Sequence, residues 1–141
     1  LSVELDGAPA TGACCVNIGN PHAVFFVDDA EAVLLAKIGP ALEHHPMFPE
    51  FANIEFATVQ SRTKLRMRVW ERAAGITQAC GSGACAVLVA AVRRGLTERK
   101  ADVILDGGPL TIEWTEQGRV LMTGPTATSF SGSITLQTPH G

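Results

Sequence analysis

The strongest apolar pattern in the chain is a continuous run at 84–92, where all nine residues are hydrophobic. Glycine and serine occupy 81–83, and two arginines follow at 93 and 94. The pattern predicts a helix over 81–94. Because a helix that is apolar on all sides must be surrounded by other elements, we expect this helix to lie at the centre of the fold.

Alternation and short apolar runs predict strands on both sides of this helix. Residues 65–70 alternate Leu65, Met67 and Val69 with two arginines, the period of two that a half-solvated strand shows. Turns that contain glycine separate three of the later runs, which indicates an antiparallel meander. The expected strands are 14–18, 24–27, 53–59, 65–70, 103–105, 110–114, 120–123 and 133–136.

The remaining segments divide into a turn, a second helix and a loop. Gly-Asn-Pro-His at 19–22 is a turn tetrapeptide, and two prolines mark 44–51 as a loop. Apolar residues at helical spacing predict a helix at 31–42, with Pro40 near its end. The expected fold class is α+β, with a curled, mostly antiparallel sheet around one central helix. We expect residues 1–125 to form this lobe and residues 126–141 to form a loosely held tail.

Composition narrows the class of protein. The chain has 141 residues, which suits one domain, and a net charge of −3, which argues against nucleic acid as a partner. Its longest apolar run is far shorter than the ~20 residues that span a bilayer, so no membrane is expected. No signal-peptide pattern is visible, and we expect a cytoplasmic protein. The chain begins with Leu1 in an apparent strand, so we expect a fragment of a longer protein.

One of the four cysteines stands in a distinctive place. Cys14, Cys15 and Cys85 lie in apolar segments, and no CxxC or Cys/His spacing indicates a metal, so free thiols are expected. Cys80 instead precedes Gly81-Ser82-Gly83 at the predicted helix start. First-turn N–H groups lack helical partners and carry partial positive charge, which favours an anion and eases thiol ionisation. We therefore expect a reactive cysteine beside a site for a small anion.

Glu71 and Arg72 end a predicted strand eight or nine residues before Cys80. The connection from strand to helix should bring all three residues to one edge of the sheet. A carboxylate near the sulfur would hold the thiol proton, whereas an arginine would favour the thiolate. The sequence leaves both alternatives open.

Asn20, His22 and Asn53 are ordinary turn residues when each is taken singly. The motifs that contain them are specific as a set. In chain order the set is Gly19-Asn20-Pro21-His22, His45-Pro46-Met47-Phe48-Pro49, Asn53-Ile54-Glu55-Phe56, Val69-Trp70-Glu71-Arg72, Ala79-Cys80-Gly81-Ser82-Gly83-Ala84-Cys85-Ala86 and Met122-Thr123-Gly124-Pro125. With this set the chain closely resembles the C-terminal half of the diaminopimelate epimerase family, over essentially all of its length.

The resemblance implies an epimerase without a cofactor that interconverts LL- and meso-diaminopimelate, in lysine and peptidoglycan-precursor synthesis. Members of the family have two similar lobes, each a sheet around a central helix, with the substrate between them. One cysteine of each lobe faces the substrate α-carbon, from opposite sides. The first lobe is missing here, so the chain should be inactive alone, and its uncovered face should favour a homodimer.

The resemblance also implies roles for particular residues. Cys80 corresponds to the catalytic cysteine of the second lobe, Glu71 to the carboxylate that tunes it, and His22 to the histidine that tunes the cysteine of the other lobe. The implied substrate ligands are Asn20, Asn53, Glu71 and Arg72 for the distal amino-acid end, and the N–H groups of Gly81 and Ser82 for the α-carboxylate. No metal site is implied.

Two positions depart from the family pattern, and two other functions stay open. Ala73 stands where members more often have glycine, and Phe130 where some have a tyrosine at a dimer contact. The tail from 126 would pack on the missing lobe. Proline racemase-like and phenazine-biosynthesis-like isomerases share the fold, so another amino acid could be the substrate. A stand-alone ligand-binding lobe without catalysis is the third reading.

Overall fold

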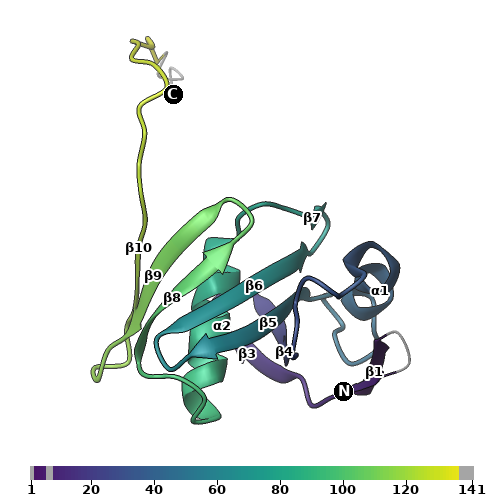
Figure 1. Cartoon of the computed structure of the whole chain (residues 1–141). Helices are drawn as coiled ribbons and strands as arrows, with labels where there is room; N and C mark the ends of the chain where they lie inside the picture. Colours follow the sequence, from purple (N-terminus) through teal and green to yellow (C-terminus); the bar gives the residue numbers. More distant parts are fainter. Residues whose placement is uncertain (1, 6–7, 137–141) are drawn as a thin grey trace.

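The computed structural model describes residues 2–5 and 8–136, and its largest element is a curled eight-stranded sheet around the helix α2 (Gly81–Arg93). The sheet has the strand order β10-β9-β8-β6-β5-β4-β3, and β7 is added at β6 (Figure 1). A separate hairpin precedes it. The sheet strands are β3 (Cys14–Asn17), β4 (Pro21–Phe26), β5 (Asn53–Ser61), β6 (Lys64–Glu71), β7 (Gly75–Ile76), β8 (Lys100–Leu105), β9 (Gly108–Trp114) and β10 (Val120–Thr123), and the hairpin pairs β1 (Ser2–Leu5) with β2 (Ala8–Thr11).

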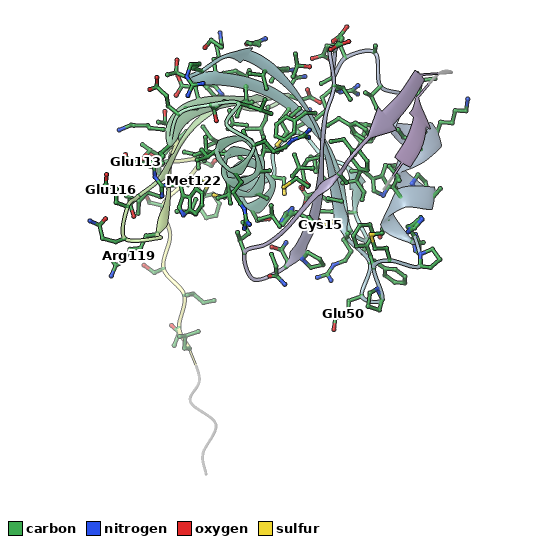
Figure 2. The ribbon with its side chains drawn as sticks, turned by 90° about the horizontal axis from the view of Figure 1, so that it is seen from below. Cys15, Glu50, Glu113, Glu116, Arg119 and Met122 are labelled. Atoms are coloured by element: carbon green, nitrogen blue, oxygen red, sulfur yellow. The ribbon has the colours of Figure 1, made fainter. Side chains whose placement is uncertain are left out.

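The helix α2 lies at the centre, as its apolar sequence predicts. It contacts seven strands, from β3 at one end of the sheet to β10 at the other. Figure 2 shows it nearly end-on, between β3 with Cys15 and the β9–β10 hairpin with Glu113 and Arg119. Eight of its residues are buried, and six of them pack with Leu65, Met67 and Val103 in the larger hydrophobic core. The expected fold, an α+β lobe around a central helix, is confirmed.

Most strand pairs are antiparallel, including the expected β8–β9–β10 meander. Two pairs are parallel, β4 with β5 and β6 with β8. Each parallel pair is joined through a helix, since α1 (Leu35–Glu43) connects β4 to β5 and α2 connects β6 to β8. The first crossover places α1 on the opposite face of the sheet from α2. Phe25, Ile54 and Phe56 pack beneath α1 in a second core, so β5 is buried on both faces.

The first helix begins later than its sequence pattern predicts. The prediction was 31–42, whereas α1 runs from Leu35 to Glu43. The guanidinium of Arg68 on β6 donates to the carbonyl oxygens of Ala30, Glu31 and Val33, which a helix would need for its own hydrogen bonds. Pro40 lies inside the helix and has no N–H to donate to the preceding turn, but the helix continues past it, and the Pro40 carbonyl accepts from His44 N–H.

Two other predictions are wrong. Pro21 and His22 belong to β4 and not to the turn, because they pair with Asn17 and Val16 of β3. The expected strand at 133–136 is absent, and the described residues from 124 onward have no regular structure. Figure 1 shows this segment running away from the sheet after β10. Phe130 is 86 % exposed. Among the described residues, no strand lies beside this segment to pair with it.

Glu43 at the end of α1 holds the turn that follows β6. Its carboxylate accepts hydrogen bonds from Trp70 Nε1 at 2.7 Å and from the Ala73 N–H at 2.8 Å. Burial raises the pKa of Glu43, but these two donors and the nearby His44 and Arg72 outweigh it, so the pKa lies below its ordinary value. The ionised carboxylate thus ties α1 to the backbone beside Arg72.

Replacing Ala73 with glycine should stabilise the protein. Ala73 has φ of +63°, in the left-handed region where a side chain is strained. Removing the methyl group relieves that strain, partly offset by the greater freedom of the unfolded chain, so we expect the free energy of unfolding to rise by about 1 kcal/mol. Urea denaturation measures the change. Ala74→Gly is the matched control, since its backbone has no positive φ and should give no gain. Destabilisation by Ala73→Gly would contradict the prediction.

Candidate active site

Cys80 lies at the first turn of α2, where the sequence places it. Its backbone is extended, and it forms the N-cap of the helix. The sulfur accepts a hydrogen bond from Gly83 N–H at 3.3 Å and lies 3.6 Å from Ser82 Oγ. The residue is 5 % exposed. All four cysteines are free, and Cys80 is the one in contact with polar groups of the predicted site.

Gly83 leaves little room for a side chain in this packing. A Cβ atom there would lie 3.0 Å from Glu55 Oε1 and 3.1 Å from the Cys80 sulfur. The glycine therefore lets a carboxylate from β5 and the cysteine sulfur approach the same point of the helix backbone. Gly81 has a similar role, because its Cβ would lie 2.9 Å from the sulfur of Met122 on β10. Met122 is labelled in Figure 2.

The expected ease of ionisation of Cys80 is wrong for this structure. Burial raises the pKa of the thiol, and the charges of Glu71 and Glu55 raise it further. The hydrogen bonds from Ser82 and Gly83 lower the pKa but do not balance these effects, so it lies above its ordinary value. Of the two alternatives that the sequence left open, the carboxylates dominate. The sulfur is a protonated thiol at neutral pH, able to donate a proton.

A chain of polar side chains leads from β5 to this thiol. His22 is buried on β4, and its Nδ1 lies 2.6 Å from Glu55 Oε1. Its Nε2 lies 3.0 Å from Asn20 Oδ1, and Asn20 Nδ2 lies 3.4 Å from Ser82 Oγ. Ser82 then contacts Cys80. The structure thus brings together four predicted site residues, Asn20, His22, Cys80 and Ser82. Asn20 and Ser82, which are in contact, lie 62 positions apart in the sequence.

Asn53 and Arg72 form the neighbouring part of the site. Asn53 on β5 pairs with His22 on β4, and its side-chain amide donates to the Pro21 carbonyl at 3.0 Å. Its Oδ1 accepts from Arg72 N–H at 3.0 Å, and the Arg72 guanidinium donates to the Glu50 carbonyl at 2.9 Å. Asn53 therefore ties the starts of β4 and β5 to the end of β6. Arg72 is half-buried beside it.

Glu71 ends β6 and accepts a hydrogen bond from the hydroxyl of Thr77, in the connection to α2. It raises the thiol pKa of Cys80 through its charge, in agreement with its predicted place at the same sheet edge. Glu55 lies in the Asn53-Ile54-Glu55-Phe56 motif, but no role was predicted for it. A single charged residue inside the apolar run 53–59 was the available signal, because a buried carboxylate needs a partner.

The described residues contain no cluster of three or more side chains suited to a metal ion. In the part of the chain that the structure covers, no helix combines the length and the hydrophobicity that crossing a bilayer demands.

Comparison with known proteins identifies relatives of this chain. The family model described as diaminopimelate epimerase matches residues 14–128. The chain is 63 % identical over 134 residues to a diaminopimelate epimerase of Rhodospirillum centenum, covering 95 % of this chain and 46 % of the relative. It is 52 % identical to that of Acidiphilium cryptum, covering 95 % and 48 %. The chain thus spans about half the length of the curated relatives that it matches.

Solved structures share the fold at lower identity. A phenazine biosynthesis protein of the PhzF family from Bacillus anthracis superposes with a TM-score of 0.52 at 24 % identity, over 75 % of this chain and 34 % of that protein. A PhzF-family protein from Enterococcus faecalis gives 0.54 at 16 % identity, over 70 % and 35 %. These likenesses establish the fold alone.

Proposed function

Because this chain belongs to the diaminopimelate epimerase family, we propose that it is one lobe of a two-lobed enzyme that interconverts LL- and meso-diaminopimelate without a cofactor. The observation that carries the proposal is Cys80, a thiol seated at the N-cap of the central helix, beside the first-turn N–H groups. The first lobe, which this chain lacks, would supply the opposing cysteine. The enzyme would act in the cytoplasm, where thiols stay reduced.

The helix terminus supports binding of the substrate α-carboxylate. The N–H groups of Gly81 and Ser82 belong to the first turn, which has no partners for them within the helix, and the helix dipole adds positive charge there. When the α-proton leaves, negative charge develops on the carboxylate. Donors that already point at it stabilise that charge without having to rearrange.

Cys80 would exchange protons on one face of the α-carbon. The partner cysteine of the other lobe, as a thiolate, takes the α-proton from the far face, and the C–H bond breaks. Cys80 as a thiol then gives its proton to the near face, a new C–H bond forms, and Cys80 is left as the thiolate. The product has inverted configuration, and the reverse reaction exchanges the two roles. The raised thiol pKa of Cys80 favours its protonated form before donation.

Selectivity would come from the neighbouring polar group. Arg72 can pair with the distal carboxylate of diaminopimelate, and Glu71 can pair with its ammonium group. Asn20 and Asn53 add amide donors and acceptors at the same end. In support of this arrangement, Asn53 already ties the Arg72 backbone to the start of β4. A substrate with one charged end, such as proline, would leave these groups unpaired.

The test is proton exchange in the two-lobed protein, in which this chain follows its own N-terminal lobe. Incubated with LL-diaminopimelate in deuterated water, that protein should form the meso isomer and incorporate deuterium at the α-carbon, followed by NMR. The 141-residue chain alone should do neither. Turnover of proline instead would favour the proline racemase-like alternative. Binding of diaminopimelate without exchange, with no lobe encoded upstream, would favour a stand-alone binding lobe.

We expect the isolated chain to associate with itself. Several large apolar side chains are exposed, including Leu121, Met122 and Phe130, and apolar surface of this kind marks contact sites. We propose that this surface and the tail 126–141 meet the other lobe in the whole protein; residues 137–141 lie outside the described part. Sedimentation velocity at rising concentration should reveal a dimer. A strict monomer at the highest concentration would contradict this expectation.

A further inference from the structure

Glu55 is a fully buried carboxylate that the proposed reaction does not use. It lies in the middle of β5 with no exposed surface, on the side of the sheet that faces α2. One of its oxygens, Oε1, contacts His22 Nδ1 at 2.6 Å, and the other, Oε2, has no hydrogen-bond partner. A buried carboxylate is costly unless it is paired or protonated. His22 is therefore the partner that lowers the free-energy cost of burying this carboxylate.

The contacts of His22 decide where one of its protons lies. Both ring nitrogens face oxygen atoms, Nδ1 that of Glu55 and Nε2 that of the Asn20 amide. The Asn20 amide is oriented by its own NH₂ group, which donates toward Ser82 Oγ. In this orientation the amide oxygen can only accept, so Nε2 carries a proton and donates it to Asn20.

A second proton lies between Nδ1 and Glu55 Oε1. It belongs either to the ring, which is then a cation beside a carboxylate, or to the carboxyl group, which then donates to a neutral ring. In both arrangements the pair has no net charge, as its complete burial requires. Asn20 thus accepts the proton of Nε2, while Glu55 shares the second proton with Nδ1 and fixes the ring between the two partners.

We propose that Glu55 is a positioning residue, which shares one proton with His22 and so holds Asn20 and Ser82 in the orientation that faces Cys80. The path runs from Glu55 through His22, Asn20 and Ser82 to the cysteine sulfur, with each step a hydrogen-bond contact. Its catalytic consequence rests on the proposed function, because Asn20 and Cys80 would contact the substrate there. The sharing of a proton between Glu55 and His22 does not depend on the proposed function.

The first test is NMR of the 141-residue chain with ¹⁵N-labelled histidine. Unchanged protein should show a proton on His22 Nε2 and one strongly downfield proton at Nδ1, the mark of a short shared hydrogen bond. Glu55→Gln keeps the shape but cannot share a proton in this way, so the downfield signal should disappear. Glu43→Gln is the matched control, another buried glutamate but one bonded to Trp70 and Ala73, and it should leave the His22 signals unchanged.

Two results would overturn the proposal. One is an unprotonated Nε2 in the unchanged chain, which requires no variant to fold. The other is a Glu55→Gln spectrum identical to that of the unchanged chain. Either result can be read whether or not the protein proves to be an epimerase.

The second test is kinetic and uses the two-lobed protein. Glu55→Gln should lower kcat/KM for diaminopimelate about tenfold, the scale of one misplaced hydrogen bond. If Glu55 acts through His22, adding Glu55→Gln to His22→Gln should lower kcat/KM no further. Full additivity of the two changes would show that Glu55 acts separately from His22 and would refute the positioning role.

Discussion

Replacing Cys80 with alanine in the two-lobed protein should lower the rate of epimerisation by at least about a thousandfold, the scale of a lost general acid and base. The variant keeps the first turn of α2 and the N–H groups that would bind the carboxylate. It loses the group that takes or gives a proton on one face of the α-carbon. The loss should therefore appear in kcat, with substrate affinity little changed.

Conversion of LL- to meso-diaminopimelate is the measurement, because net inversion needs both faces. Cys85→Ala is the matched control, since Cys85 is a free, half-buried thiol in the same helix that packs against the hydrophobic core and makes no side-chain hydrogen bond among the described residues. We expect that variant to keep a rate close to the unchanged protein. Epimerisation that survived Cys80→Ala would remove the central residue of the proposed mechanism.

Replacing Gly39 with alanine should destabilise the protein by about 2 kcal/mol, although alanine is the better helix former by about 1 kcal/mol. Gly39 lies in α1 against the indole of Trp70. An added Cβ would lie 2.6 Å from Trp70 Cγ and 2.7 Å from Cε3, well inside contact distance. The ring cannot withdraw easily because its Nε1–H donates to buried Glu43.

Urea denaturation of the 141-residue chain measures this effect as a lower midpoint at constant slope. Gly132→Ala is the control, because its Cβ would meet no atom within 4 Å. That control should leave the midpoint unchanged. A higher midpoint for Gly39→Ala would mean that helix propensity outweighs the collision, and that α1 does not pack against Trp70 as described.

Local patterns predicted the elements that depend on nearby residues. The apolar run 84–92 predicted the buried helix, because no arrangement leaves such a surface in water at low cost. Alternation predicted β6, and the Gly-Ser-Gly segment predicted the start of α2 directly after Cys80. The order of motifs pointed to the family that the comparisons support.

Tertiary contacts decided the features that depend on distant residues. The helix α1 begins at Leu35, later than predicted, because Arg68 from the distant strand β6 donates hydrogen bonds to the carbonyl groups that an earlier helix start would use. His22 entered β4 because β3 pairs with it. A pattern within one segment contains no information on such partners.

Patterns within the sequence were sufficient to predict the fold class and the place of Cys80 at the start of the central helix. They could not determine the ionisation of that thiol, since the helix start lowers the pKa while burial and two carboxylates raise it. One of these carboxylates, Glu55, lies 33 positions from its partner His22. The balance between such opposing effects depends on distances and burial, which exist only once the chain has folded.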